Sequence, residues 1–206
     1  MTATAPSTPP YRHGPRGFDA IVIGGSAGAI DAISTILPSL QAQTRVAVLV
    51  TLHLPREAPS LLPEIFRPRC ALRTAEAQDK EPIEAGNVYF APPDYHLLVD
   101  AGPRLALSVD EPVHFSRPSI DVLFESAADI YGERLVGMLL SGANQDGARG
   151  MAAIGAAGGL CIVQAPGSAA MSMMPQSALD LMAPHHTLAP SEIASLLTEL
   201  QMRRIL

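Results

Sequence analysis

The chain has 206 residues, of which 48% are hydrophobic and 17% are charged, and its formal net charge is -6. A chain of this length can bury about 70% of its unfolded surface in one domain, so its stability requires neither a metal nor a disulfide framework. The acidic balance argues against a nucleic-acid-binding surface. No apolar run approaches the roughly 18 residues of a membrane span, so we expect no direct membrane insertion.

The N-terminal segment, residues 1–17, is rich in Pro, Thr and Gly. This composition predicts a disordered tail or the remnant of a linker, and the segment lacks the hydrophobic core of a signal peptide. We therefore expect the folded domain to span residues 18–206.

An alternation of strand and helix begins after this segment. The apolar run Ala20–Ile23 predicts a strand, a glycine-rich turn follows at 24–28, and apolar residues at helical spacing predict a helix up to about Pro38. A second apolar strand, Val46–Leu52, then completes a strand–turn–helix–strand unit. Such a unit implies a parallel sheet. We therefore predict an α/β fold with a doubly wound, mostly parallel sheet flanked by helices.

The middle of the chain, residues 72–109, has a different pattern. Short strands are split by turns rich in Pro and Gly, which predicts a short antiparallel excursion at the sheet edge. The strands expected there are Val88–Ala91, His96–Val99 and Leu105–Val109. The alternation then resumes, with helices expected at 119–130, 148–157, from about 175 and at 191–203, and strands at 135–140 and 160–164.

Three side chains with catalytic potential lie just beyond the ends of apolar strands: Ser26, His53 and Asp146. Ligands bind at the carboxyl ends of the strands in a parallel sheet. If the three strands are neighbours, a nucleophile, a base and an orienting carboxylate converge on one edge, which is the logic of a Ser–His–Asp triad. Gly24-x-Ser26-x-Gly28 also matches the pattern of a nucleophile elbow.

Each of these residues has a simpler alternative role. A glycine-rich turn after a first strand often binds phosphate, although the dinucleotide fingerprint fails because Ser26 occupies its second glycine position. His53 is also compatible with a hydrogen-bonded structural role. Asp146 is also a candidate cap for a helix beginning at Gly147. The order Ser…His…Asp differs from that of α/β-hydrolases.

The sequence shows no spacing typical of a metal site. His185 and His186 are adjacent, so their rings cannot share one helical face. The two cysteines, Cys70 and Cys161, are too few for a disulfide framework or a thiolate metal site. Their apolar surroundings favour buried structural thiols, and the default location is a reducing cytoplasm.

Taken together, the residues from about Ile21 to Leu197 resemble the CheB-type methylesterase domain of bacterial chemotaxis. Six blocks carry the resemblance in order and spacing: 21–29 (IVIGGSAGA), 53–55 (HLP), 88–96 (VYFAPPDYH), 117–124 (RPSIDVLF), 140–148 (LSGANQDGA) and 174–175 (MP).

The resemblance implies a Ser26–His53–Asp146 triad that hydrolyses glutamyl methyl esters on chemoreceptor cytoplasmic helices and releases methanol, without metal or cofactor. Some family members also deamidate receptor glutamines. Many carry an N-terminal receiver domain, which we do not expect within this sequence, so a separate receiver or other regulatory protein is an expected partner.

The chain departs from the family pattern at positions expected to border the site. The family usually has Gly at the place of Ala29, Gly-Met-Gly where Gly142-Ala143-Asn144 stands, and an aromatic and a glycine in place of Ser172 and Met173. These departures leave two alternatives open. One is a non-catalytic signalling module with the same fold, and the other is an esterase that acts on a protein outside chemotaxis.

Overall fold

The structure, a computed structural model, describes residues 17–55 and 59–206. The expected tail lies outside the described residues, apart from Gly17. Within the described part of the chain, no helix is both long enough and apolar enough to cross a membrane.

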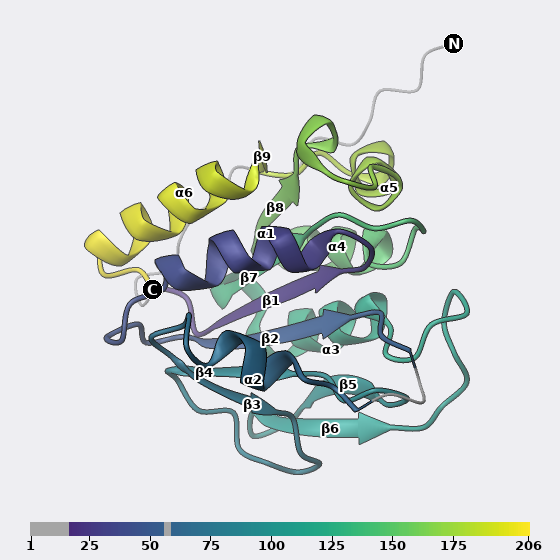
Figure 1. Ribbon diagram of the computed structural model, residues 1–206, viewed down its shortest axis with the longest axis horizontal. Coiled ribbons are helices and arrows are strands. Elements are labelled where there is room, and N and C mark those ends of the chain that lie inside the picture. Colours follow the sequence, from purple (N-terminus) through teal and green to yellow (C-terminus); the bar gives the residue numbers. More distant parts are fainter. Residues whose placement is uncertain (1–16, 56–58) are drawn as a thin grey trace.

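The centre of the fold is a sheet of parallel strands in the order β3-β4-β2-β1-β7-β8-β9 (Figure 1). Its central strands are buried along their whole length and consist largely of Val, Ile, Leu and Ala, the composition expected of strands covered on both faces. The bounds are β1 Ala20–Gly25, β2 Ala47–Leu52, β3 Arg73–Glu76, β4 Asn87–Phe90, β7 Leu135–Leu139, β8 Leu160–Gln164 and β9 His186–Leu188.

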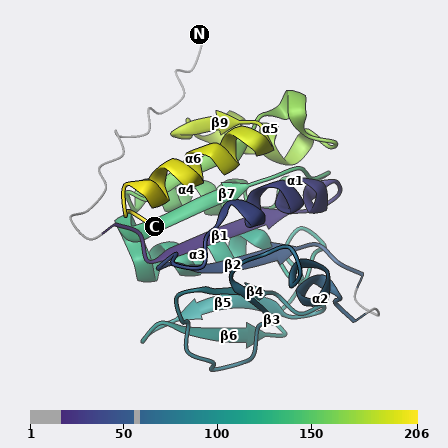
Figure 2. The same ribbon diagram turned by 60° about the vertical axis from the view of Figure 1, so that its left-hand side comes forward.

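Helices cover both faces of this sheet, and both ribbon views show this arrangement (Figures 1 and 2). One apolar cluster joins the sheet to α1, α2 and α6, and a second cluster joins its other face to α3, α4 and α5. The doubly wound α/β fold is therefore confirmed. The bounds are α1 Ala29–Ile36, α2 Leu62–Phe66, α3 Ile120–Tyr131, α4 Ala148–Ala156, α5 Met173–Leu181 and α6 Pro190–Met202.

The antiparallel excursion is present but smaller than expected. It consists of β5, His96–Asp100, paired with β6, Arg104–Ser108. The strand predicted at Val88–Ala91 instead forms β4, which pairs in parallel with β2 and β3 in the main sheet. Short turns on either side of this strand suggested a hairpin, but its apolar side chains are buried in the main core. The edge strand β3 was not predicted, because its sequence RTAE has no apolar run.

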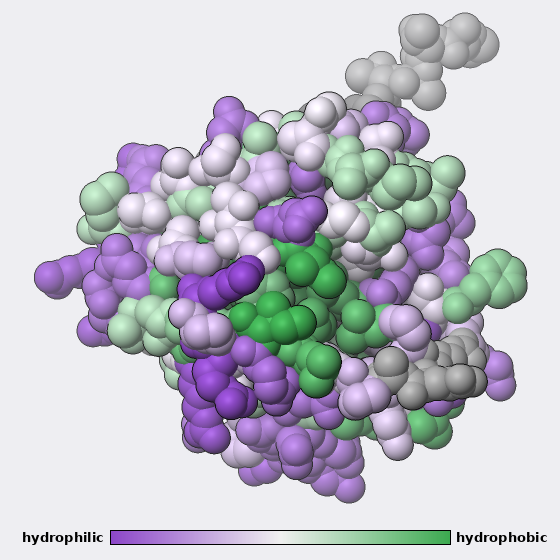
Figure 3. Space-filling model, viewed as in Figure 1, coloured by the Kyte–Doolittle hydropathy of each residue, from purple (hydrophilic) through white to green (hydrophobic). Residues whose placement is uncertain are grey.

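The face that carries α1 and α2 has an apolar area at its surface (Figure 3). Ile30 of α1, Leu61 just before α2 and Ile65 of α2 are exposed there. This area lies on the opposite face of the sheet from α3, α4 and α5.

Candidate active site

The predicted site residues follow three neighbouring strands, because β1 lies between β2 and β7 in the sheet. Gly25, the last residue of β1, is in register with Leu52, the last residue of β2. Ser26 and His53 are therefore the next residues on adjacent strands. The His53 amide donates to Gly25 O at 3.3 Å and extends the ladder by one bond. Since paired strands lie about 4.8 Å apart, the backbone holds Ser26 and His53 side by side.

His53 and Asp146 are in direct contact. His53 Nε2 lies 2.8 Å from Asp146 Oδ2. The Asp146 side chain is fully buried, whereas 14% of the His53 side chain is exposed. A buried carboxylate that accepts a hydrogen bond from Nε2–H fixes the ring in one tautomer and leaves Nδ1 free to act as an acceptor.

The Asp146 carboxylate is held by the first turn of α3. Ser119 Oγ donates to Oδ1 at 2.9 Å and the Asp121 amide donates to Oδ1 at 3.0 Å. The Ile120 amide donates to Oδ2 at 2.7 Å. Burial acts to raise the pKa of Asp146, but the hydrogen bonds from His53 and from the two amides outweigh it, so the pKa lies below its ordinary value. The carboxylate therefore stays ionised beside His53.

Asp146 does not cap the helix that follows it. The residue before α4 is Gly147, which has a φ of 93° and makes no side-chain capping bond. The carboxylate instead satisfies amides of α3, a helix that begins 26 residues earlier in the chain. The capping role is therefore real, but it serves a different helix, and it coexists with the contact to His53.

The Ser26 turn is fixed mainly through its backbone. The Ser26 amide donates to Ser141 O at 2.8 Å, and Ser26 O accepts from the Ala29 amide at 3.0 Å. Gly28 has a φ of 81°, and a Cβ there would come within 2.5 Å of Ala170 Cβ, so this position requires glycine. Among the described residues, no hydrogen bond joins Ser26 Oγ to His53. The structure thus pairs His53 with Asp146 and places Ser26 on the adjacent strand end.

Other serines that support these three residues were not predicted from the sequence. Ser116 Oγ lies 3.4 Å from His53 Nδ1. Ser141 Oγ donates to Ala27 O at 2.7 Å and accepts from the Met171 amide at 2.9 Å. Ser119 lies in the block RPSIDVLF, so the family resemblance already pointed to the segment that contains it. Nothing in the local pattern singles out Ser116.

A second carboxyl group lies beside the site. Asp121 is buried, and its Oδ1 accepts from the Gly150 amide at 2.7 Å. Its Oδ2 lies 3.6 Å from His114 Nε2. Burial raises the pKa of Asp121, and the neighbouring charge of Asp146 adds to this effect against the lowering by the Gly150 amide. The two adjacent carboxyls therefore have pKa values displaced in opposite directions.

Cys161 is buried, as expected, whereas Cys70 is only partly buried. Both are free. Burial raises the pKa of Cys161 to about 12 and raises that of Cys70 as well, so neither thiol is activated. Within residues 17–55 and 59–206, no group of three or more His, Cys, Asp or Glu side chains is arranged to hold a metal ion.

Of the positions that depart from the family pattern, Ala29 and Asn144 contact the catalytic candidates directly. Ala29 is buried at the start of α1, where a Cβ on Gly25 would come within 2.4 Å of its Cβ. Asn144 Oδ1 accepts from the Asp146 amide at 3.2 Å. Ala143, Ser172 and Met173 are exposed.

Comparison with known proteins gives one family. The family model described as CheB methylesterase matches residues 21–197. A Leptospira interrogans protein, named for protein-glutamate methylesterase and protein-glutamine glutaminase, is 41% identical over 91% of this chain and 97% of its own length. A protein of the same name from Symbiobacterium thermophilum is 38% identical over 86% of this chain but 49% of its own length. The crystal structure of the Thermotoga maritima CheB methylesterase catalytic domain matches with a TM-score of 0.85 at 27% identity, covering 89% of this chain and 98% of that one.

Proposed function

The chain belongs to the CheB methylesterase family, and we propose that Ser26, His53 and Asp146 are its catalytic triad. The reaction of this family is the hydrolysis of protein glutamate methyl esters. The observation that carries the assignment is the 2.8 Å contact between His53 Nε2 and a buried, ionised Asp146, at the strand end next to Ser26.

The contact with Asp146 assigns the two ring nitrogens of His53. Because Nε2–H donates its hydrogen bond to the carboxylate, Nδ1 is the basic nitrogen that takes the proton of Ser26. Ser116 Oγ is 3.4 Å from Nδ1 and occupies part of its surroundings. Asp146 keeps the ring in this tautomer and stabilises the imidazolium that forms during the reaction.

The reaction proceeds in two acyl-transfer steps. Ser26 Oγ attacks the ester carbonyl carbon while His53 Nδ1 takes the serine proton. His53 returns this proton to the methoxide oxygen, so that methanol leaves and the glutamyl group remains as an ester of Ser26. Water then attacks the acyl-enzyme with His53 as base, which frees the glutamate carboxyl group and restores Ser26. If the substrate is a glutamine side chain, ammonia leaves in place of methanol.

The amino terminus of α1 supports the oxyanion of both steps. The helix begins at Ala29, three residues after Ser26. Its unpaired amides and its dipole present positive charge next to the reacting carbonyl. The preceding Gly28, with its positive φ, allows the chain to turn sharply enough for this approach.

The proposed substrate is a glutamyl methyl ester on a cytoplasmic helix of a chemoreceptor. The support is the family membership, together with relatives named for protein-glutamate methylesterase and protein-glutamine glutaminase. A separate receiver or other regulatory protein is the proposed regulatory partner, and the proposed place of action is the cytoplasm, where receptor signalling helices lie.

The test is methanol release from a methylated chemoreceptor cytoplasmic fragment by Ser26→Ala. Loss of the nucleophile should lower kcat by at least about 10⁴-fold. Ser195→Ala is the matched control, because Ser195 is exposed on α6 and bonds to Ser191 O within its own helix. Activity of Ser26→Ala within tenfold of the wild type would contradict the triad.

A serine-directed phosphonate separates an active enzyme from a non-catalytic module. We expect the wild-type protein to be labelled at Ser26, with labelling lost in Ser26→Ala and retained in Ser195→Ala. Assays against methylated receptors and against other methyl-esterified proteins then identify the substrate.

A further inference from the structure

We propose that a groove between residues 113–116 and α5 binds the substrate as an amphipathic α-helix, with Phe115 as its main apolar anchor. The proposal rests on the proposed function, because this helix would carry the glutamyl ester to Ser26. Three features support it: the shape of the turn that carries Phe115, the groove beside that turn, and the links of both to the triad.

Phe115 stands at the tip of a two-residue turn. The Val113 amide donates to Ser116 O at 3.1 Å, and the Ser116 amide donates to Val113 O at 2.8 Å. The central residues, His114 and Phe115, have φ values of 49° and 61°, in the left-handed region that residues other than glycine occupy at a cost. Phe115 is 99% exposed. A strained turn that holds an aromatic ring in water is the kind of feature that concentrates at binding sites.

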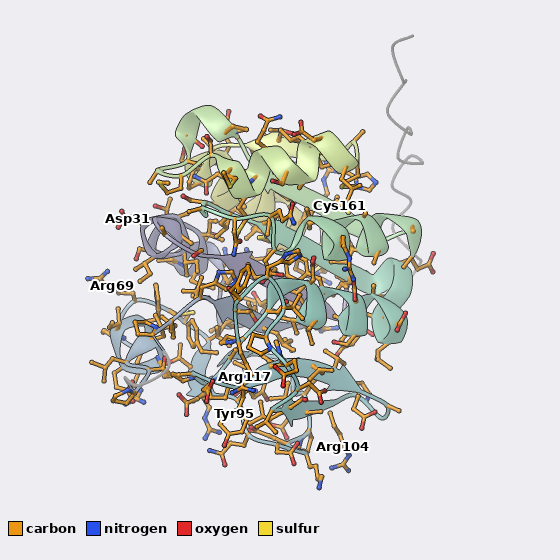
Figure 4. All side chains as sticks on the ribbon, turned by 90° about the vertical axis from the view of Figure 1, so that its right-hand side faces the viewer. Asp31, Arg69, Tyr95, Arg104, Arg117 and Cys161 are labelled. Atoms are coloured by element: carbon orange, nitrogen blue, oxygen red, sulfur yellow. The ribbon has the colours of Figure 1, made fainter. Side chains whose placement is uncertain are left out.

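The turn is tethered to the body of the domain on both sides. Arg117 donates to Asp94 Oδ1 from Nε and Nη2, at 3.0 and 2.8 Å. Figure 4 places Arg117 beside Tyr95, the next residue after Asp94. On the other side, His114 Nε2 lies 3.6 Å from Asp121 Oδ2. A ring presented by a tethered turn loses less conformational freedom on binding than one on a free loop.

A groove of about 340 Å³ lies beside this turn. His114 lines it on the side of the turn, and Ser177 and Leu181 line it on the side of α5. Gln145 and, at the start of α4, Ala148 and Arg149 also contribute to its walls, as does Asp180 of α5. Figure 1 shows that the loop between β6 and α3 projects beyond the carboxyl ends of the strands, and Figure 3 shows an apolar projection at the same place.

The turn that carries Phe115 and the segment before α5 each connect to the proposed triad. Phe115 precedes Ser116, whose Oγ lies 3.4 Å from His53 Nδ1. Two residues before α5, the exposed Met171 is joined through Ser141 Oγ to Ala27, the residue after Ser26. A molecule that extends from the groove to contact Phe115 and Met171 would therefore lie next to the reacting groups.

The distribution of side chains favours a helix as the occupant. Leu181 supplies an apolar contact within the groove, and the exposed Phe115 and Met173 supply apolar contacts at the tip of the turn and at the start of α5. The rest of the groove is largely polar or charged, with the side chains of Gln145, Arg149, Ser177 and Asp180. An amphipathic helix can bury its apolar face against such a groove and keep its polar face in water. Flexible methionine side chains suit a surface that accepts related sequences.

The experiment measures affinity in a Ser26→Ala background, which prevents turnover. The probe is a folded, methylated chemoreceptor cytoplasmic fragment, and the variants are Phe115→Ala, Phe115→Leu and Leu181→Ala. We expect Phe115→Ala to raise Kd by 10- to 100-fold, as for other buried aromatic anchors (about 1.4 to 2.8 kcal/mol). Phe115→Leu should recover part of the affinity, and Leu181→Ala should raise Kd by about threefold to tenfold.

Two exposed apolar residues provide matched controls. Met202 lies at the end of α6, near the amino-terminal edge of the sheet, and Ile65 belongs to the apolar area over α1 and α2. Met202→Ala and Ile65→Ala should leave Kd within twofold of the parent. With Ser26 intact, Phe115→Ala should raise KM by the same factor as Kd while kcat changes less than threefold.

The outcomes separate this inference from the proposed function. If Ser26→Ala still hydrolyses the ester, the proposed function fails first. If Ser26→Ala is inactive but Phe115→Ala changes neither Kd nor KM by more than twofold, the docking proposal alone is overturned. A loss confined to kcat would also overturn it, because it would assign Phe115 to the positioning of His53. A larger effect of Ile65→Ala would place the helix over α1 and α2 instead.

Discussion

The turn at residues 113–116 and the start of α3 at residues 119–121 are three residues apart in the chain, yet their surroundings are opposite. The turn holds Phe115 almost fully in water, whereas Ser119 is completely buried. The Ser119 hydroxyl and the amides of Ile120 and Asp121 are directed at one carboxylate, that of Asp146. The turn leaves its largest side chain without a protein surface to cover it.

This contrast separates chemistry from recognition within one short segment. A catalytic carboxylate must keep its charge and its position, so it is surrounded by donors that are already in place. A surface that selects a protein partner must instead leave apolar area available for burial on binding. The two parts can therefore be disturbed independently, and substitutions at each should affect different measurements.

The largest effect is expected at the buried carboxylate. Asp146→Asn removes the charge that orients His53, and the amide nitrogen cannot accept the hydrogen bonds that the lost oxygen accepted. We expect kcat to fall by roughly 10³- to 10⁴-fold, as in serine proteases with the equivalent change. Methanol release from the methylated fragment measures this. Asp129→Asn, at an exposed position on α3, is the control and should retain full activity. Retention of more than a tenth of kcat by Asp146→Asn would remove Asp146 from the triad.

Ser119→Ala tests the hydrogen bonds around the carboxylate without changing its charge. The substitution removes the 2.9 Å bond from Ser119 Oγ to Asp146 Oδ1 in a buried site, which should cost about 1–3 kcal/mol of unfolding free energy. Urea denaturation measures this cost, with Ser195→Ala as a surface control. An unchanged denaturation midpoint would show that another group satisfies Oδ1.

The lowered pKa of Asp146 predicts a specific acid dependence of stability. Its contribution to the unfolding free energy should be fully present above the ordinary carboxyl value of 3.8 and should be lost as the pH falls through the lower pKa of the folded protein. Urea denaturation between pH 2 and 6 should therefore give a steeper decline of the unfolding free energy for the wild type than for Asp146→Asn. Parallel curves would mean that the pKa of Asp146 is not lowered by folding.

The smallest effect is expected at the tether of the turn. Arg117→Ala removes the bonds to Asp94 and should raise Kd for the methylated receptor fragment by about threefold, because it adds the entropy of ordering the turn to the cost of binding. In a protein that already carries Phe115→Ala, Arg117→Ala should raise Kd hardly any further. This double-mutant cycle tests whether Arg117 acts through Phe115, and fully additive effects would show that Arg117 contributes elsewhere.

The strand ends were the predictable part of the site. Ser26 and His53 follow apolar strands on either side of one helix, and a parallel sheet brings such positions to the same edge. The partners of Asp146 were not predictable in this way, because the first turn of α3 reaches it through tertiary packing. Local sequence suggested a cap for the next helix, whereas the fold uses the carboxylate for an earlier one.

The sequence around Phe115 contains no local pattern that predicts the turn. Two-residue turns of this kind are normally recognised by Asn-Gly or related pairs, and His114-Phe115 is not such a pair. The strand β4 shows the same limitation, because its flanking turns suggested a hairpin while its buried side chains place it in the main sheet. Both cases depend on contacts between residues distant in sequence.

The pairing of Gly25 with Leu52 has a consequence for how this enzyme can vary in length. Main-chain hydrogen bonds set the spacing of Ser26 and His53, so the crossover between β1 and β2 can gain or lose residues without moving either side chain. An insertion within β1 or β2 would slide one partner by about 3.3 Å and turn its side chain to the opposite face of the sheet. Insertions should therefore be tolerated in the connections of this domain and excluded from these two strands.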